Sequence, residues 1–476
     1  MKQCMVKPKI GTMAIGLKSY WAQFPGMKAH LEAKHEELLQ KLDGKAELIK
    51  CGMVDTIELS AEAGRRFKEA DVDLVFIQSM TYATSNAVIP AVKDLDVPII
   101  ILNIQEVPSL DFKNVNHIDD WLGHGIPCAG VPELTAVFNA YGLRYDVITG
   151  YLHGDCVVEQ ELDRWCKAAQ VRARMRASSV GILGRQFYGM LDLYLNENTI
   201  MKQFGMMTVF LMWEDVIKYA QEVTAEEKQK NLEMISKVFS VPDTVAESEL
   251  ENIAVMYGGY MKLVEKYNLS VVANHFEREM IGKEIDMIAA LNPANTMMIS
   301  EGIACTVEGD LKAGIAMLIL KTIAGSANLS ELYSMDFHND VLILGHSGAS
   351  DPAISDVKPI LNTTSVFHGK SGKGFTTQAV PRTGPITLLA LVEKQGGGFK
   401  MIASEGIVEK GEILNLGDTN CRVRFEIPMR DFTNKWCMAG PSHHGVMGSG
   451  LHVNTLAAVA KVLNVEFEVI GKKTNV

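Results

Sequence analysis

Val97-Pro98-Ile99-Ile100-Ile101-Leu102 is an apolar run with polar residues on both sides, and it indicates the fold class of this chain. Such a run is typical of a strand that is buried on both faces of a parallel sheet. Similar strand-like runs and the amphipathic stretches between them occur at residues 10–15, 27–42, 48–51, 60–70 and 74–77. Strands that alternate with helices predict a parallel sheet wound by crossover helices, so we expect an α/β fold that begins with a Rossmann-like domain.

Polar residues follow two of these predicted strands. Gln78-Ser79-Met80-Thr81-Tyr82 comes after one strand, and Asn103-Ile104-Gln105-Glu106 comes after the next. Open α/β sheets bind ligands at the carboxyl ends of their strands. These two segments are therefore expected to contact a hydroxylated ligand.

The alternation continues through the middle of the chain. Further helix-like and strand-like segments lie at residues 134–143, 147–150, 179–184, 207–212 and 269–273. The run Ser240-Val241-Pro242-Asp243-Thr244 precedes a long helical pattern that ends near Lys266. Asp and Thr are preferred helix N-caps, so Asp243 or Thr244 is expected to cap this helix.

The sequence pattern changes near residue 355, where turns rich in Gly, Ser and Thr separate short runs of alternating polarity such as 386–392 and 399–403. This pattern predicts an antiparallel sheet or a small barrel, followed by a closing helix at 452–462 and a last strand at 467–470. We therefore predict three domains. They are an N-terminal α/β domain (1–125), a central parallel-sheet α/β domain (126–355) and a C-terminal antiparallel β-rich, barrel-like domain (356–476).

Composition excludes several classes of protein. The 476 residues carry a net charge of -11 without a Lys/Arg cluster that could follow a phosphate backbone, which argues against nucleic acid as a partner. The eight cysteines form no CxxC pair, and no Walker or G-x-G-x-x-G loop indicates a nucleotide. We found no signal peptide or membrane-length apolar run, so we expect a cytoplasmic protein without a membrane partner.

Four residues in the last third of the chain are candidates for metal binding and catalysis, and each is expected where a hydrophobic element meets a loop. Glu308 precedes the apolar helical run 311–324, and Glu331 opens a mixed segment. His346 ends the apolar run 341–345, and His444 lies in a loop of small residues. Two carboxylates and two imidazoles can hold a divalent ion and leave positions open for a substrate.

Simpler explanations exist for each of these residues. Glu308 or Asp310 could merely complement a helix dipole, and a histidine at a strand end is often only solvated. His443 and His444 are neighbours, and adjacent side chains usually point in different directions. At most one of the two histidines is therefore expected to bind a given ion.

Two glutamates beside a cation would suit aldose–ketose isomerisation. That reaction moves protons between adjacent carbons and oxygens, and it needs a group that polarises the carbonyl. Glu308 and Glu331 could form the acid–base pair, while the cation would stabilise the enediolate. The residues therefore favour a metal-dependent sugar isomerase.

The chain resembles the L-arabinose isomerase family, within the wider L-fucose/L-arabinose isomerase group. The matching motifs follow the family's order between about residues 300 and 450. They are Glu308-Gly309-Asp310 with Lys312-Ala313, Glu331 with Tyr333 and Phe337, Leu344-Gly345-His346, Arg382-Thr383-Gly384-Pro385, and Ala439-Gly440 with His443-His444.

The resemblance implies further properties. It implies Mn2+ as the usual ion, with another divalent cation as the alternative, held by Glu308, Glu331, His346 and His444. It also implies a homo-oligomer, a tetramer or hexamer, in which the N-terminal domain of a neighbouring subunit can complete the sugar pocket. Candidate sugar-binding residues are Thr81, Gln105, Glu106, Glu133, Tyr333 and His443.

The N-terminal half departs from the family's pattern where that pocket would be lined. Met80-Thr81-Tyr82 replaces His before Thr-Phe, Asn103 to Glu106 replaces Phe-His-Thr-Gln, and Cys128 to Glu133 replaces His-Gly-Gly-Arg-Glu. Lost imidazoles change the donors offered to sugar hydroxyls, so the substrate is expected to be a sugar other than L-arabinose. The alternatives are an epimerase or other enediolate chemistry on a modified sugar or sugar acid, and a non-catalytic sugar-binding homologue.

Overall fold

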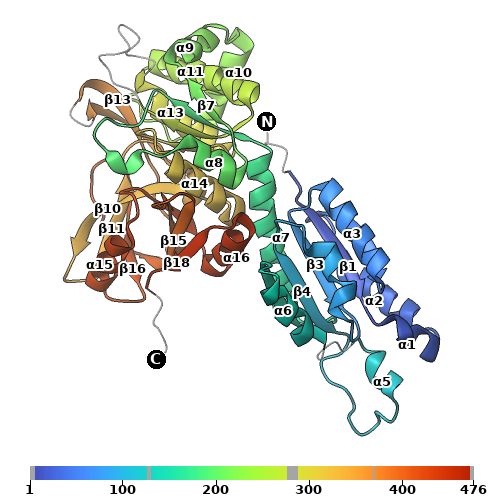
Figure 1. Ribbon diagram of the computed structural model, residues 1–476. Helices are drawn as coiled ribbons and strands as arrows, with labels where there is room; N and C mark the ends of the chain where they lie inside the picture. The colour runs from blue at the N-terminus through green and yellow to red at the C-terminus, as the bar shows by residue number, and fades with distance from the viewer. Residues whose placement is uncertain (1–5, 126–129, 276–287, 368–369, 472–476) are drawn as a thin grey trace. The chain divides into compact units, whose positions relative to one another are not determined.

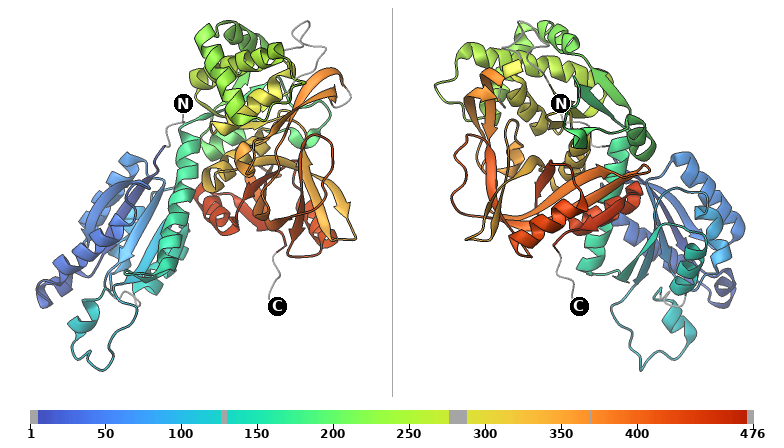
Figure 2. Two further views of the ribbon diagram at one scale, coloured as in Figure 1. Left: turned by 180° about the vertical axis from the view of Figure 1, so that it is seen from behind. Right: turned by 60° about the vertical axis from the view of Figure 1, so that its left-hand side comes forward.

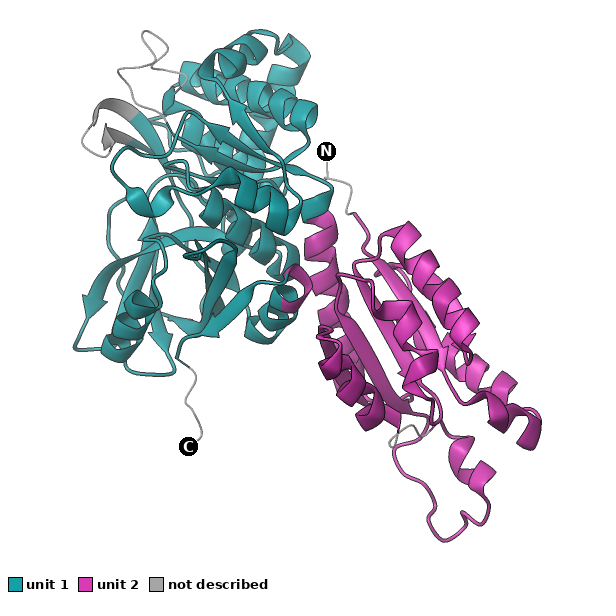
Figure 3. Ribbon diagram, in the orientation of Figure 1, with its two compact units in different colours: residues 1–5, 175–460, 464–476 teal, residues 6–174, 461–463 magenta. Residues whose placement is uncertain are grey.

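The computed structural model describes residues 6–125, 130–275, 288–367 and 370–471 (Figure 1). Cys128 and Ala129, in one of the segments that depart from the family, lie outside the described residues. The chain divides into two compact units (Figure 3). Residues 6–174 and 461–463 form the N-terminal unit, and residues 175–460 make up most of the large unit.

The N-terminal unit contains a five-stranded sheet in the order β2-β1-β3-β4-β5, and every pairing in it is parallel. The strands are β1 (Lys9–Ile15), β2 (Glu47–Val54), β3 (Leu74–Ser79), β4 (Ile99–Gln105) and β5 (Tyr145–Tyr151). The main helices are α2 (Met27–Gln40), α3 (Ile57–Ala70), α6 (Gly130–Ala140) and α7 (Cys156–Arg176), and shorter ones are α1 (Lys18–Gln23), α4 (Ile89–Val92) and α5 (Ile118–Leu122). The predicted Rossmann-like alternation is confirmed.

Helices cover both faces of this sheet (Figures 1 and 2). Phe67 of α3 and Phe138 of α6 pack with Met13 and Ile15 of β1 on one face. Met27 and other residues of α2 pack on the opposite face. Gly11 allows α3 to approach β1, because a Cβ atom there would lie 2.7 Å from the ring of Phe67.

His35 of α2 is a buried polar residue of this unit. Its Nδ1 lies 2.8 Å from Gln78 Oε1 of β3, and its side chain is enclosed by the protein. Burial disfavours the charged imidazolium and lowers the pKa of His35 below its ordinary value. His35 is therefore held as a neutral ring.

The large unit begins with a four-stranded parallel sheet in the order β7-β6-β8-β9. Its strands are β6 (Ser179–Leu183), β7 (Thr208–Leu211), β8 (Leu269–Asn274) and β9 (Ala304–Thr306). Its helices include α8 (Glu197–Phe204), α9 (Trp213–Gln221), α10 (Ala225–Val238), α11 (Glu247–Tyr267) and α13 (Leu291–Ser300). The N-cap prediction for α11 is wrong, because Ala246 holds that position and its N–H donates to the Glu249 carboxylate at 2.8 Å.

A closed antiparallel barrel follows in the large unit. Its six strands run in the order β14-β17-β10-β11-β16-β15, and β14 pairs with β15 to close the ring (Figure 2). The strands are β10 (Asn328–Asp336), β11 (Val341–His346), β14 (Gly384–Glu393), β15 (Phe399–Glu409), β16 (Thr419–Phe425) and β17 (Gly445–Ser449). The remaining elements are β12 (Ile360–Phe367), β13 (Lys370–Gln378), α15 (Met429–Ala439), α16 (Val453–Leu463) and β18 (Glu466–Val469), which extends the sheet beside β15.

Helix α14 (Leu311–Ala324) joins the parallel sheet to the barrel. It contacts β8 and β9 of the sheet and also β14 and β17 of the barrel. Contact on opposite sides explains why its sequence is apolar around most of its circumference. The predicted α/β class with two parallel sheets and a barrel-like β-rich part is confirmed, whereas the three domain boundaries stay predictions.

Among the helices of the described ranges, none combines the length and the apolar character needed to cross a membrane.

We predict that His35 makes the N-terminal unit sensitive to acid. Because its pKa is lower in the folded than in the unfolded state, the unfolded chain binds this proton first as pH falls. Its contribution to stability is present above about pH 6.5 and is lost below it, by up to about 1.4 kcal/mol per pH unit. In urea unfolding between pH 7 and 5, the free energy of unfolding should fall less steeply for His35→Gln than for the wild-type protein.

The matched control is His30→Gln, which changes a more exposed histidine of the same helix. Equal pH slopes for the wild-type protein and His35→Gln would contradict the assignment.

Candidate metal centre and active site

Glu308 lies in a tight turn between β9 and α14. Glu308 and Gly309 both have left-handed backbone conformations, with φ of 60° and 75°. This conformation disfavours a residue with a Cβ atom, so the surrounding structure must hold Glu308 in place. Gly309 N donates to Asn274 O at 3.1 Å, and Phe187 N donates to Glu308 O at 2.9 Å.

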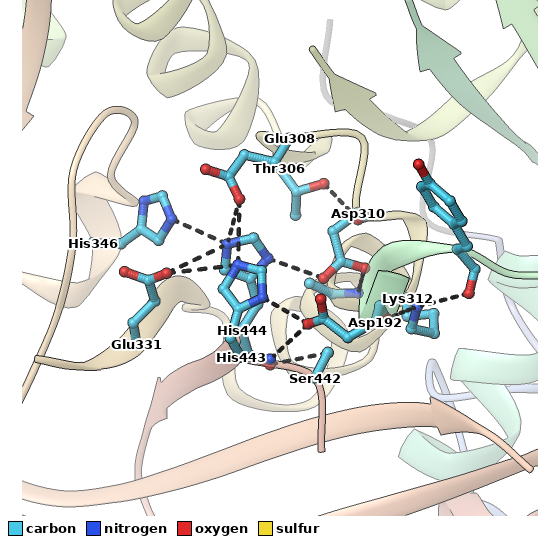
Figure 4. A network of polar contacts seen from close by, with 12 residues as sticks. Asp192, Thr306, Glu308, Asp310, Lys312, Glu331, His346, Ser442, His443 and His444 are labelled. Atoms are coloured by element: carbon cyan, nitrogen blue, oxygen red, sulfur yellow. Dashed lines mark hydrogen bonds and ion pairs between the residues drawn. The ribbon is translucent and has the colours of Figure 1, made fainter. Parts of the chain in front are cut away.

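The next residue, Asp310, immediately precedes α14 and contacts two partners. Its Oδ1 accepts a hydrogen bond from Ala313 N at 3.0 Å, which caps the helix, and its Oδ2 lies 3.0 Å from His444 Nδ1. Asp310 is therefore the N-cap, a position that Asp often occupies. Glu308 instead points away from the helix toward the histidines (Figure 4).

Glu331 and His346 lie on neighbouring barrel strands. Glu331 of β10 pairs with Gly345 of β11, and His346 is the last residue of β11. Glu331 was expected at the end of an element, and this prediction is wrong because β10 continues to Asp336. An element that begins as buried and becomes partly exposed resembles a loop in sequence.

His443 and His444 precede β17, which pairs with the other edge of β10. The strand order β17-β10-β11 thus brings His444, Glu331 and His346 together. We expected the two adjacent histidines to point in different directions. Instead both rings turn toward the same cluster, with centroids 4.0 Å apart (Figure 4).

His444 Nε2 lies at the centre of this cluster. It is 3.3 Å from His346 Nε2, 3.5 Å from Glu308 Oε2 and 3.9 Å from Glu331 Oε1. His443 Nε2 lies 3.3 Å from the same Glu308 oxygen and 3.7 Å from Glu331 Oε1. The structure therefore brings together all four residues predicted as ligands, with His443 beside them.

The other ring nitrogen of each histidine is held by an oxygen that can only accept. His346 Nδ1 lies 2.5 Å from Ser347 O, His443 Nδ1 lies 2.6 Å from Asp192 Oδ2, and His444 Nδ1 faces Asp310. A carbonyl or ionised carboxylate has no hydrogen to give, so each Nδ1 is assigned as the donor. The Nε2 atoms of His346 and His444, when these rings are neutral, then present lone pairs to the cluster, whereas His443 donates from Nε2 to Glu308.

This donor set fits a divalent cation. His346 Nε2 and His444 Nε2 are close together, and two lone pairs at that distance repel unless a proton or a cation lies between them. Within the described ranges, Glu331, His346 and His444 form one set of ligand atoms within 4.8 Å of one another, and Glu308, His443 and His444 form another. Metal-binding histidines commonly donate their second N–H to a carboxylate or carbonyl, as these do.

Charges in the cluster shift two ionisations. Burial raises the pKa of Glu308, but the hydrogen bond from His443 and the charges of His444 and His346 outweigh burial and leave the pKa below its usual value. Hydrogen bonding to Glu308 raises the pKa of His443 to about 9 against the opposing effect of burial, and Asp192 contributes in the same direction. Glu308 is therefore ionised at neutral pH.

Tyr333, a predicted sugar-binding residue, lies in the same barrel strand as Glu331. Its hydroxyl donates to Asp418 Oδ2 at 3.2 Å. Burial, followed by the negative charges of Asp418 and Glu331, raises the pKa of Tyr333 above its ordinary value. Tyr333 is a neutral donor that is already engaged.

The other predicted sugar-binding residues belong to the N-terminal unit. Gln105 and Glu106 line a pocket there with Lys34 and His124, and Glu106 is 2.9 Å from Lys34 Nζ. Thr81, Gln105 and Glu133 each contact a main-chain atom, of Leu17, Val107 and Ser85 respectively. Their part in sugar binding stays a prediction.

Two residues that contact the histidines of the cluster escaped the sequence reasoning. Asp192 lies in the short turn Leu191–Leu193, which has no recognisable motif, and it reaches His443 from 251 residues away. Asp310 was considered as a helix-terminal charge and as part of a family motif, without a role at the site. Its position two residues after Glu308 was the available signal for a role at the site.

We predict that His346→Ala weakens Mn2+ binding. The variant removes one converging Nε2, and even changes to the partners of metal ligands cost about 10–100-fold in affinity or activity. Calorimetric titration should give at least a tenfold rise in Kd. His338→Ala, in the exposed turn between β10 and β11, is the control, and an unchanged Kd in His346→Ala would remove His346 from the ligand set.

Comparison with known proteins agrees with the motifs. Residues 326–466 match the L-arabinose isomerase C-terminal domain. L-arabinose isomerase 1 of Bacillus licheniformis is 20% identical over 93% of this chain and 92% of its own length. The enzymes of Clostridium beijerinckii and Nocardioides sp. are 20% and 21% identical, each over 83% of this chain and 80% of the relative. The resemblance seen in the motifs is confirmed, and the chain is similar to L-arabinose isomerases over most of its length.

Proposed function

We propose that this protein is a metal-dependent aldose–ketose isomerase that acts through an enediol. Its relation to L-arabinose isomerases along most of its length supports the isomerase class. The observation that carries the proposal is the convergence of Glu308 and Glu331 with three imidazole Nε2 atoms. A site that only bound a sugar would need neither two converging carboxylates nor a cation.

Glu308, Glu331, His346 and His444 would hold the ion, for which Mn2+ is the first candidate. His444 is preferred to His443 because it belongs to both sets of converging ligand atoms. When bound, the cation would polarise the sugar carbonyl and stabilise negative charge on the enediolate oxygens. Asp310 and the carbonyl of Ser347 would keep the two ligand histidines in the required tautomer.

The two glutamates would carry the protons. Glu308, ionised at neutral pH, would take the proton from the hydroxyl-bearing carbon next to the carbonyl and return it to the former carbonyl carbon. Glu331 would move a proton from the hydroxyl oxygen to the carbonyl oxygen. The products balance, because one hydrogen moves between carbons and one between oxygens.

His443 would contact the sugar rather than the ion. Its Nε2 lies between the two glutamate side chains, and its ring is partly open to solvent. This position would allow it to form a hydrogen bond with a substrate hydroxyl beside the reacting carbons.

The sugar need not be L-arabinose. In the N-terminal unit, the pocket near Gln105 contains the charged side chains of Lys34 and Glu106 together with His124. Charged groups could bind a modified sugar or a sugar acid. The second candidate function is therefore epimerisation or another enediolate reaction on such a substrate. The homo-oligomer and the completion of the pocket by a neighbouring subunit are proposed from the family resemblance alone.

We predict that Glu308→Gln and Glu331→Gln abolish most turnover. Each variant keeps the size of the side chain but cannot shuttle a proton, and loss of an acid–base group costs about 10²–10⁴-fold. The assay incubates the protein with Mn2+ in D2O against pentoses, hexoses, deoxy sugars and sugar acids, and follows deuterium incorporation by proton NMR with a chelator control.

Glu426→Gln, an exposed change just after β16, should retain activity. Full turnover in either site variant would refute the assignment of the pair. Deuterated products with inverted configuration and no ketose would favour the second candidate, and binding without metal-dependent exchange would favour the non-catalytic homologue.

A further inference from the structure

His443 differs from its neighbour in what holds it. The side chain of His444 is 0% exposed and is fixed by packing, whereas that of His443 is 33% exposed. A partly exposed ring keeps a single orientation only when hydrogen bonds define it. The contacts of its Nδ1 side therefore decide where Nε2 points.

Asp192 supplies those contacts. Its Oδ2 accepts two hydrogen bonds from the same residue, from His443 N at 3.1 Å and from His443 Nδ1 at 2.6 Å. One contact fixes the backbone of the loop and the other fixes the ring. Together they leave Nε2 facing Glu308 and Glu331 (Figure 4).

Lys312 in turn holds the segment that carries Asp192. This lysine is 3% exposed, and its Nζ donates to the carbonyl oxygens of Asp192 at 2.7 Å and Tyr194 at 3.5 Å. Burying an ammonium group costs free energy. Because Lys312 donates to two main-chain carbonyls, we infer that it fixes the position of the segment that carries Asp192. Lys312 is the second residue of α14, the helix that follows the Glu308 turn.

A simpler account is that Asp192 and His443 form an ordinary surface ion pair, which would contribute little. Two features argue against it. The carboxylate binds the backbone as well as the ring, and the contacts form a closed path from α14 through Lys312, Asp192 and His443 back to Glu308. A surface pair would not be anchored at both ends to the same functional turn.

We propose that Asp192 is a positioning residue, which holds His443 Nε2 toward the substrate side of the two glutamates, and that Lys312 fixes Asp192 for this task. This inference rests on the proposed function, because the held Nε2 would bind a sugar hydroxyl. Asp192 acts on the reaction through His443 and does not touch the ion.

The test compares Asp192→Ala, Asp192→Asn and Lys312→Met with Asp243→Ala, an exposed aspartate of the same unit. For Asp192→Ala we expect kcat to fall about 10–100-fold, as for other residues that orient a functional histidine, and KM to rise. Asparagine keeps an oxygen acceptor, so Asp192→Asn should recover most of the loss. Lys312→Met should show a smaller loss, and Asp243→Ala none.

Mn2+ affinity separates this role from a role in the metal site. The Kd for Mn2+ should stay within about threefold of wild type in Asp192→Ala, because Asp310 holds His444 independently. A Kd that rises in parallel with the loss of kcat would overturn the proposal. So would an unchanged kcat in Asp192→Ala, or an Asp192→Asn variant as impaired as Asp192→Ala.

Crystal structures of the variants test the inference even if the wild-type protein turns over none of the sugars. The His443 ring should leave its position facing Glu308 in Asp192→Ala and keep it in Asp192→Asn. A ring that stays in place in Asp192→Ala would overturn the positioning role, whereas silence of the wild-type protein alone would count only against the isomerase proposal.

Discussion

The hydrogen bonds on the Nδ1 atoms of His346, His443 and His444 are the constraint on which the site depends. Each is accepted by an oxygen without a hydrogen, so all three rings turn Nε2 inward, and in neutral His346 and His444 this atom presents a lone pair. With two glutamates beside them, the centre of the cluster is rich in electron pairs. A bound cation would balance this arrangement, and without one a protonated His443 offsets part of the charge.

The barrel and the buried helix α14 bring these residues together. Strands β17, β10 and β11 are consecutive in the ring, so His444, Glu331 and His346 meet. Glu331 and His444 are 113 positions apart in the sequence (444 minus 331). Helix α14 packs against both the parallel sheet and the barrel. The helix thereby places the turn that carries Glu308 next to the barrel residues of the cluster.

Much of this could be predicted from sequence, because strands buried on both faces and a helix that is apolar all round leave clear patterns. Glu308 and His346 were found because each adjoins such an element. Glu331 was expected where a hydrophobic element meets a loop, because only part of β10 is buried. Asp192 could not be found, since a hydrogen bond between distant loops leaves no periodic trace.

The most direct test of the account is anomalous X-ray diffraction from crystals grown with Mn2+, recorded on both sides of the manganese absorption edge. The account predicts a manganese peak within about 2.0–2.4 Å of Glu308, Glu331, His346 Nε2 and His444 Nε2, the range of direct metal–ligand distances. A cluster with the same side-chain arrangement and no manganese peak at a saturating concentration would contradict it.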